Sequence, residues 1–170
     1  MIFYFSATGN SKYVVSRISK ITGDEIFGID SCTREKNLTF KTTGNENIDI
    51  VVSVFTGALP IIVDDLFNKV DLSRESKGHN FAVVTYRLNT GAADYYLKNK
   101  MTNKALPLYA LFSVKYPDSF TPLFNVSNKE KVQKKVKEAE PQIDYQLIRL
   151  KTKSKVILLK KSPWTCSSYT

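Results

Sequence analysis

Apolar residues in this sequence form short runs that alternate with helically spaced stretches. Runs rich in β-branched and aromatic residues predict buried strands, and apolar residues three or four apart predict helices. The expected strands cover residues 1–5, 25–29, 48–55, 81–86 and 106–114, the last starting just after Pro107. A first helix is expected with apolar positions 14, 18 and 21, a second over 61–70 behind Pro60, and a third over 92–101. A fourth is expected from the capping box at 127–130 toward residue 140, and another helical stretch beyond Pro141. Residues 31–47 are polar and predict a loop.

Alternating strands and helices predict an α/β fold with a five-stranded parallel sheet. Right-handed crossovers place the helices on both faces, which gives a three-layer sandwich. Ligands of such sheets bind at the carboxyl ends of the strands, where the strand order reverses. Three turns would meet at that edge, at residues 6–11, 56–60 and 86–91, and each contains one glycine.

The first of these turns is uncharged and rich in hydrogen-bonding groups. It holds the hydroxyls of Ser6, Thr8 and Ser11, the amide of Asn10, and Gly9, before the first charge at Lys12. Free N–H groups and the positive end of a helix dipole favour a phosphate at such a position. The alternative is that Ser6 or Thr8 only caps the helix. Four polar groups exceed what one cap requires, so the sequence favours an anion site.

Several known loops are excluded by the residues themselves. Residues 9–12 read Gly-Asn-Ser-Lys, which does not match the phosphate-binding loop Gly-x-x-x-x-Gly-Lys-Ser/Thr of nucleoside triphosphatases. The dinucleotide-binding fingerprint Gly-x-Gly-x-x-Gly needs three glycines, and this turn has only one. The turn has no cysteine nucleophile, and the chain has no Gly-x-Ser-x-Gly elbow. A single terminal phosphate remains the best candidate ligand.

Composition limits the organisation of the chain. With 170 residues and 42% hydrophobic content, we expect one domain. No run approaches the roughly 20 apolar residues of a membrane span, and Met1 opens directly into a strand, so a cytoplasmic protein without membrane attachment is expected. Cys32 and Cys166 match neither a disulfide framework nor a metal site, and His79 lies in a loop composition.

Most of the positive charge belongs to the last quarter of the chain. The net charge is +9, and residues 129–170 hold eleven Lys and Arg against four Asp and Glu. The lysines at 129, 131, 134, 135 and 137 go round a helix without interleaved aromatics, which disfavours nucleic-acid binding. The expected phosphate turn therefore lies in the nearly neutral part of the chain.

These residues resemble the flavodoxin family. The segment Phe5-Ser6-Ala7-Thr8-Gly9-Asn10-Ser11 is similar to the family's phosphate loop, Thr/Ser-x-Thr-Gly-x-Thr/Ser. Residues 2–15, 54–60, 81–91 and 113–118 resemble the flavodoxin domain of bacterial and archaeal proteins in which a ferredoxin-like iron–sulfur domain follows. The resemblance implies a flavodoxin-like domain over residues 1–145, a strand order of 2-1-3-4-5, and a basic tail over 146–170. Whether the chain lacks a further domain stays open.

The resemblance also implies a binding site for FMN. The phosphate would lie against Ser6, Ala7, Thr8, Gly9, Asn10 and Ser11, and the ring between two groups of residues: Phe55, Thr56, Gly57 and Ala58 on one side, and Tyr86, Arg87, Leu88, Asn89 and Gly91 on the other. Phe55 and Tyr86 would stack on the ring, unless they are core residues at the ends of their strands. In the family, a turn such as Thr56-Gly57 changes peptide orientation with the oxidation state of the flavin.

Three departures from the family pattern matter. Ala58 and the pair Arg87-Leu88 stand where those proteins often have glycines, and no Cys-x-x-Cys cluster follows. Arg87 would raise the flavin potential if it lay near the ring, but it can equally point to solvent. The chain itself cannot hold iron–sulfur centres.

The implied function is electron transfer by bound FMN, alone or as the flavin module of a larger oxidoreductase, with ferredoxin-like or reductase partner proteins. No residue pattern supplies a catalytic acid, base or nucleophile, which fits a carrier; an NAD(P)H-dependent FMN reductase stays open. The alternative is a flavin-free binding module of the same fold whose basic tail contacts an acidic partner or RNA.

Overall fold

The computed structural model describes residues 1–36, 38–42, 46–74 and 79–116, together with 137, 140, 141 and 143–145. Its strands and helices alternate along most of this length. The strands are β1 (Ile2–Phe5), β2 (Ile26–Gly28), β3 (Thr39–Thr42), β4 (Asp49–Ser53), β5 (Asp71–Arg74), β6 (Asn80–Tyr86) and β7 (Leu108–Lys115). The helices are α1 (Asn10–Thr22), α2 (Ile29–Glu35), α3 (Ile61–Lys69) and α4 (Ala93–Asn103).

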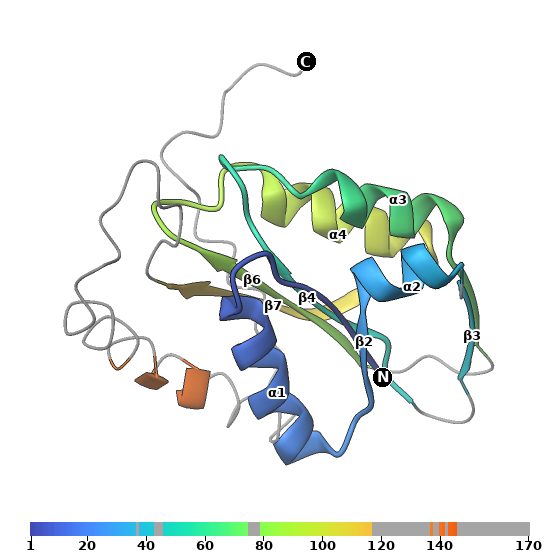
Figure 1. Cartoon of the computed structure of the whole chain (residues 1–170), viewed down its shortest axis with the longest axis horizontal. Helices are drawn as coiled ribbons and strands as arrows, with labels where there is room; N and C mark the ends of the chain where they lie inside the picture. Colours follow the sequence, from blue (N-terminus) through green and yellow to red (C-terminus); the bar gives the residue numbers. More distant parts are fainter. Residues whose placement is uncertain are drawn as a thin grey trace.

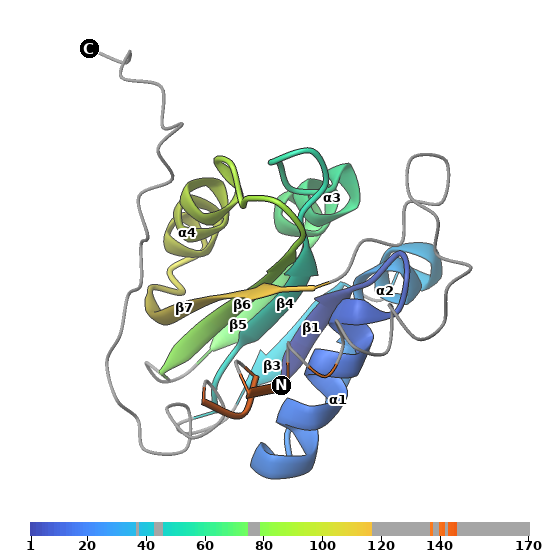
Figure 2. The same ribbon diagram turned by 90° about the vertical axis from the view of Figure 1, so that its left-hand side faces the viewer.

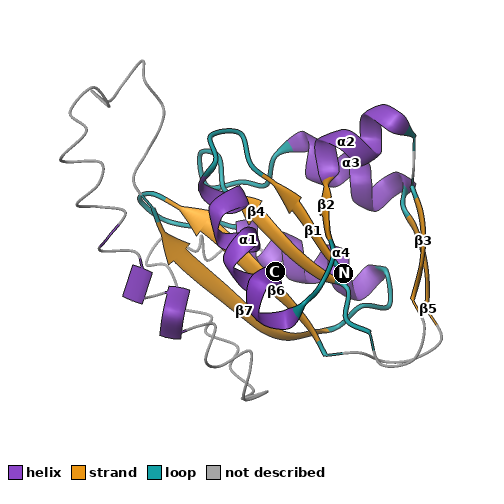
Figure 3. Ribbon diagram, turned by 60° about the horizontal axis from the view of Figure 1, so that its bottom comes forward, coloured by secondary structure: helices purple, strands orange, loops and turns teal. Residues whose placement is uncertain are grey.

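Five strands form the main sheet in the order β2-β1-β4-β6-β7, and every neighbouring pair is parallel. The predicted α/β fold with a five-stranded parallel sheet is therefore confirmed. The order differs from the expected 2-1-3-4-5 in one respect. Two further strands, β3 and β5, intervene in the chain and form a separate two-stranded parallel sheet beyond α2 and α3 (Figure 3).

Helices cover both faces of the main sheet, which gives three layers (Figures 1 and 2). Helix α1 covers one face and buries Val14, Val15 and Ile18 against it. Ile21, expected on the same apolar stripe, is instead 42% exposed near the carboxyl end of α1. Helices α2, α3 and α4 lie on the other face and share a second apolar core with the sheet.

The expected loop over residues 31–47 was wrong in part. Residue Ile29 begins α2 rather than ending a strand, and β3 follows within the same polar stretch. Only Ile29 and Cys32 of α2 are buried, so its seven residues carry too short an apolar pattern to predict a helix. Strand β5 was also missed, and the strand expected over 48–55 ends at Ser53.

The expected helix after the capping box at 127–130 lies mostly outside the described residues. Lys137, Glu140, Pro141 and residues 143–145 are helical. Ile143 is buried in the apolar core on the α1 face. No helix in the described part of the chain is long and apolar enough to cross a membrane.

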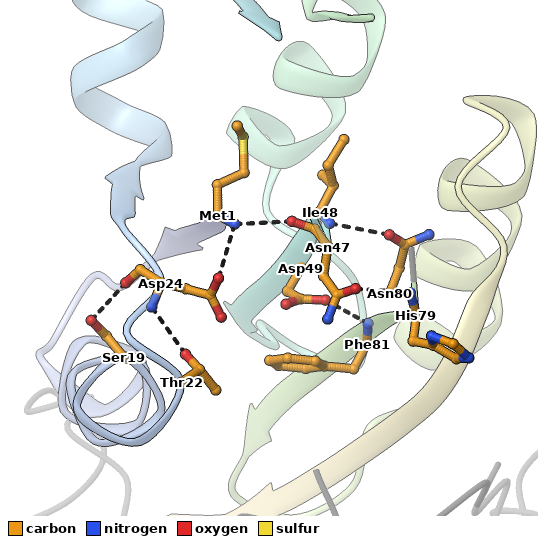
Figure 4. Close-up of polar contacts among 10 residues, drawn as sticks. All are labelled: Met1, Ser19, Thr22, Asp24, Asn47, Ile48, Asp49, His79, Asn80 and Phe81. Carbon is orange, nitrogen blue, oxygen red and sulfur yellow. Dashed lines mark hydrogen bonds and ion pairs between the residues drawn. The ribbon is translucent and has the colours of Figure 1, made fainter. Parts of the chain in front are cut away.

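Polar side chains join the amino ends of β1, β4 and β6 (Figure 4). The Asn80 side chain accepts the Ile48 N–H at 3.1 Å and donates to the Pro107 carbonyl at 3.2 Å. Asp49 is fully buried and accepts the Phe81 N–H at 2.7 Å, while its Oδ2 atom has no hydrogen-bond partner among the described residues. Burial raises the pKa of Asp49 well above its usual range. This network fixes the sheet at the edge opposite to the three expected site turns.

Candidate functional site

The turns that follow β1, β4 and β6 lie at the same edge of the sheet (Figure 1). Strands β1 and β4 are neighbours, but the chain visits β2 on the outer side of β1 before it returns to β4. The strand order therefore reverses between β1 and β4. Loops at such a reversal diverge to the two faces, which leaves room for a ligand at the carboxyl ends of the strands.

The turn after β1 presents the amino end of α1. Gly9 is the N-cap residue, with φ of 96°, and its carbonyl accepts the Tyr13 N–H at 2.9 Å. Ser6 does not cap the helix; its Oγ accepts the Gly9 N–H at 3.1 Å and so fixes the turn itself. A glycine N-cap leaves the helix start without the side-chain acceptor that Ser, Thr, Asp or Asn would supply. The alternative that Ser6 or Thr8 merely caps α1 is therefore not what the structure shows.

Neutral groups face outward in this turn. Ala7, Thr8 and Gly9 are exposed, and Ser6 and Asn10 are half-buried. The helix dipole adds a partial positive charge at the same place. An anion could therefore bind here through hydroxyl and N–H donors without a charged side chain.

Ser11 occupies a different environment from the rest of the turn. Its side chain is fully buried, and its Oγ lies 2.9 Å from Oγ1 of Thr85 on β6, which is 3% exposed. The structure therefore places this hydroxyl on the sheet side of α1 rather than beside the exposed Thr8. A serine hydroxyl has one proton, so Ser11 can donate to a second group, such as a phosphate, only if Thr85 is the donor in their shared bond.

The turn after β4 is a tight two-residue turn. Phe55 and Ala58 exchange both backbone hydrogen bonds, at 3.0 and 2.8 Å. The central residues Thr56 and Gly57 both have positive φ, 48° and 79°, as in a type I′ turn. A β-branched residue is rarely found there, and such a conformation costs roughly 1–3 kcal/mol. Its presence marks this turn as one that the surrounding structure holds in place.

Residues 87–92 follow β6 and lead into α4. Leu88 is 74% exposed, and Asn89 is also exposed. Thr90 is buried and donates its hydroxyl to Oδ2 of Asp94 at 2.8 Å. Asp94 is only 9% exposed, and within the part of the chain that the structure describes its Oδ1 has no hydrogen-bond partner. Burial raises the pKa of Asp94, although the Thr90 hydroxyl favours the ionised form.

The two expected aromatic contacts differ in exposure. Phe55 is 43% exposed, so it is not a core residue. Tyr86 is half-buried, and its carbonyl accepts the Tyr116 N–H at 2.7 Å. Burial and then the charge of Asp94 raise the pKa of Tyr86. Arg87 is half-buried as well.

The structure brings the second and third turns into direct contact. The Ala92 N–H donates to the Gly57 carbonyl at 3.0 Å, and the Asn89 side chain also lies near Gly57. The two segments expected to flank a flavin ring are therefore joined through their backbones. Within the described residues no group of three or more His, Cys, Asp or Glu is placed to hold a metal ion.

Three residues of this edge were missed from the sequence: Thr85, Ala92 and Asp94. Thr85 contacts Ser11 across 74 positions of the chain, so nothing local could indicate the pair. The spacing of Thr90 and Asp94 at a helix start was a usable signal, because residues four apart lie on the same face of a helix.

Comparison with known proteins identifies the fold family. A sequence profile described as a flavodoxin domain matches residues 1–146. A search of curated proteins found no match. The flavodoxin of Fusobacterium nucleatum, solved bound to flavin mononucleotide, superposes with a TM-score of 0.52 at 14% identity, covering 89% of this chain and 95% of that one.

A larger protein contains a similar fold. Rubredoxin oxygen:oxidoreductase from the anaerobe Desulfovibrio gigas superposes with a TM-score of 0.51 at 10% identity, over 89% of this chain. The match covers 36% of that protein, so this chain corresponds to about a third of its length. At such low identities the two structures show the shared fold, and the sequence profile shows the family. The chain belongs to the flavodoxin domain family.

Proposed function

We propose that this protein binds FMN at the carboxyl edge of its sheet and transfers electrons through it, alone or as the flavin module of a larger oxidoreductase. The observation that carries the proposal is the uncharged turn of residues 6–9 at the start of α1, next to the reversal of strand order between β1 and β4. The FMN-bound flavodoxin of F. nucleatum has the same fold, which supports the choice of cofactor.

The first turn fits the phosphate end of FMN. Ser6, Thr8, Asn10 and Ser11 with the backbone of Ala7 and Gly9 form the proposed phosphate site. Hydrogen bonds to a charged group stabilise by roughly 1.5–3 kcal/mol each. Two or three of them, with the dipole of α1, offset much of the cost of desolvating a phosphate dianion.

The second and third turns fit the ring end. Phe55 offers an exposed aromatic face, and Tyr86 lies at the end of the neighbouring part of the sheet. We assign ring contacts to Phe55, Thr56, Gly57 and Ala58, and to Tyr86, Arg87, Leu88 and Asn89, with Gly91 at the end of the same segment. The flavin, when bound, supplies the electron-transfer chemistry, while these residues orient it and keep water from its buried face.

The partner proteins proposed are redox proteins, either ferredoxin-like or reductases. The larger D. gigas protein, named for rubredoxin and oxygen, combines this fold with further chain, which is consistent with a flavin module in a redox assembly. No feature of the described residues favours the flavin-free binding module. The basic tail over 146–170, on which that alternative depends, lies outside them.

The experiment is a spectrum followed by a titration. Freshly purified protein, or protein incubated with FMN and desalted, is expected to absorb near the two visible flavin bands and to bleach on reduction with dithionite. A protein that stays colourless after loading would overturn the proposal. Lumiflavin, which has the isoalloxazine ring with a methyl group in place of ribityl phosphate, serves as the control ligand for contacts made by the ring alone.

A further inference from the structure

Gly91 lies so close to the Gly57 backbone that position 91 has no room for a side chain. A Cβ atom on Gly91 would lie 2.3 Å from the Gly57 carbonyl oxygen and 2.5 Å from the Gly57 Cα. Both distances are shorter than the non-bonded contacts that Cβ atoms make in proteins. A glycine at position 91 is therefore required for the Gly57 carbonyl to reach the Ala92 N–H.

The turn of residues 55–58, which contains Gly57, is held by few contacts of its own. It is closed by the two hydrogen bonds between Phe55 and Ala58, and Thr56 sits at a φ of 48° that β-branched residues avoid. Phe55, Thr56 and Ala58 are all exposed. A short exposed turn with a strained residue opens readily unless a neighbour holds it.

The neighbouring segment, residues 90–92, is by contrast firmly attached to α4. The Thr90 hydroxyl is bonded to Asp94 at 2.8 Å, and the Thr90 carbonyl accepts the Ala93 N–H at 3.0 Å. Both contacts attach residues 90–92 to the first turn of α4, whose Leu97 and Met101 are buried in the core. The position of the 55–58 turn is thus set by α4 through Gly91 and Ala92.

We propose that Gly91 is a positioning residue that locks the 55–58 turn, and that it acts on the cofactor through this turn rather than by contacting it. The part of this inference that concerns the cofactor rests on the proposed FMN site. The lock itself is a property of the protein without ligand, so it can be tested separately.

The first test compares two glycine variants without flavin. Gly91→Ala adds a methyl group at the contact, whereas Gly23→Ala adds one at the C-cap of α1, where φ is also positive (76°) and no atom lies within 4 Å. Both glycines have positive φ, 56° and 76°, so a methyl group strains the backbone at both positions and meets close atoms only at Gly91. Amide hydrogen exchange at Ala58 and Ala92, corrected for the global stability of each variant, is expected to be about tenfold faster or more in Gly91→Ala and unchanged in Gly23→Ala. Equal exchange in the two variants would overturn the lock.

A milder variant covers the case in which Gly91→Ala does not fold. In Gly57→Ala the new methyl would lie 3.3 Å from the Gly91 Cα, a contact that a small shift can relieve. Exchange at Ala92 is expected to rise in Gly57→Ala relative to Gly23→Ala, by less than in Gly91→Ala. No rise would overturn the lock.

The second test adds FMN. In Gly91→Ala we expect the Kd for FMN to rise about tenfold and the oxidised/semiquinone potential to shift, while Gly23→Ala keeps both wild-type values. If the wild type itself binds no FMN, the proposed function fails and the exchange data still decide the lock. If Gly91→Ala opens the turn but keeps the wild-type Kd and potential, the turn does not position the cofactor and this inference is overturned.

Discussion

The buried hydrogen bond between Ser11 and Thr85 yields the most direct energetic prediction. The two hydroxyls lie 2.9 Å apart, 0% and 3% exposed, and connect the first turn of α1 to β6. Thr85→Val keeps the shape of the side chain but leaves the Ser11 hydroxyl buried without this partner. A buried polar group that loses its partner costs about 1–3 kcal/mol, so we expect the free energy of unfolding to fall by that amount.

A double-mutant cycle separates the bond from other effects. Ser11→Ala should cost a similar amount, whereas the double variant should cost about 0.5–1.5 kcal/mol less than the sum of the two, because no unpaired hydroxyl remains. Urea unfolding of the flavin-free protein, followed by far-UV circular dichroism, gives each value, with the m-value expected to stay constant.

Ser16→Ala is the matched control for this cycle. The Ser16 hydroxyl lies on the same helix but donates to the Lys12 carbonyl at 2.8 Å in contact with solvent. Water replaces that bond, so the loss should stay below about 0.5 kcal/mol. Additive effects of Ser11→Ala and Thr85→Val, or losses no larger than that of Ser16→Ala, would refute the assignment of a buried bond here.

Three further predictions concern the turns and the opposite edge. Thr8→Val deletes an exposed donor, so the Kd for FMN, measured by fluorescence titration, should rise about ten- to a hundredfold. Thr102→Val on α4 is the control and should leave the Kd unchanged. An unchanged Kd in Thr8→Val would mean that Thr8 serves the turn alone. Thr56→Asn places a residue that tolerates positive φ before Gly57, so the free energy of unfolding, measured by urea unfolding, should rise by about 0.5–1 kcal/mol. A decrease would contradict the φ of 48° at this position. Burial raises the pKa of Asp49 above its ordinary 3.8, so the contribution of Asp49 to stability should be greatest below that pH and fall as the pH rises, because the unfolded chain ionises there first. Asp49→Asn should remove this part of the slope in urea melts from pH 4 to 8, and an unchanged slope would contradict a neutral Asp49.

The main sheet was predictable from the sequence because its strands are covered on both faces. Strand β4 is a nearly continuous run of β-branched residues, and β6 is buried along almost its whole length. Such runs need no tertiary information to identify. Helix α2 and strand β3 escaped prediction because few of their described residues reach the core, so the sequence carries little periodic signal there. Strand β5 has only four residues, of which Leu72 alone is apolar.

The candidate site was predictable in its parts but not in its connections. The glycines and hydroxyls of the three turns could be read from their spacing. The contacts that fix them could not, since Ser11 meets Thr85 and Gly57 meets Ala92 only after the sheet has formed. Phe55 shows the limit of local pattern, because it continues the apolar run of β4 in the sequence and yet is 43% exposed in the turn that follows.

The central claim is that the turn of residues 6–9 and the start of α1 hold the phosphate of FMN, and one comparison tests it most directly. The affinity for FMN and for riboflavin, which lacks only the phosphate, can be measured by quenching of flavin fluorescence on the same protein preparation. Two or more charge-assisted hydrogen bonds predict that riboflavin binds at least about a hundredfold more weakly than FMN. Affinities within about threefold of each other would contradict a phosphate site at this turn.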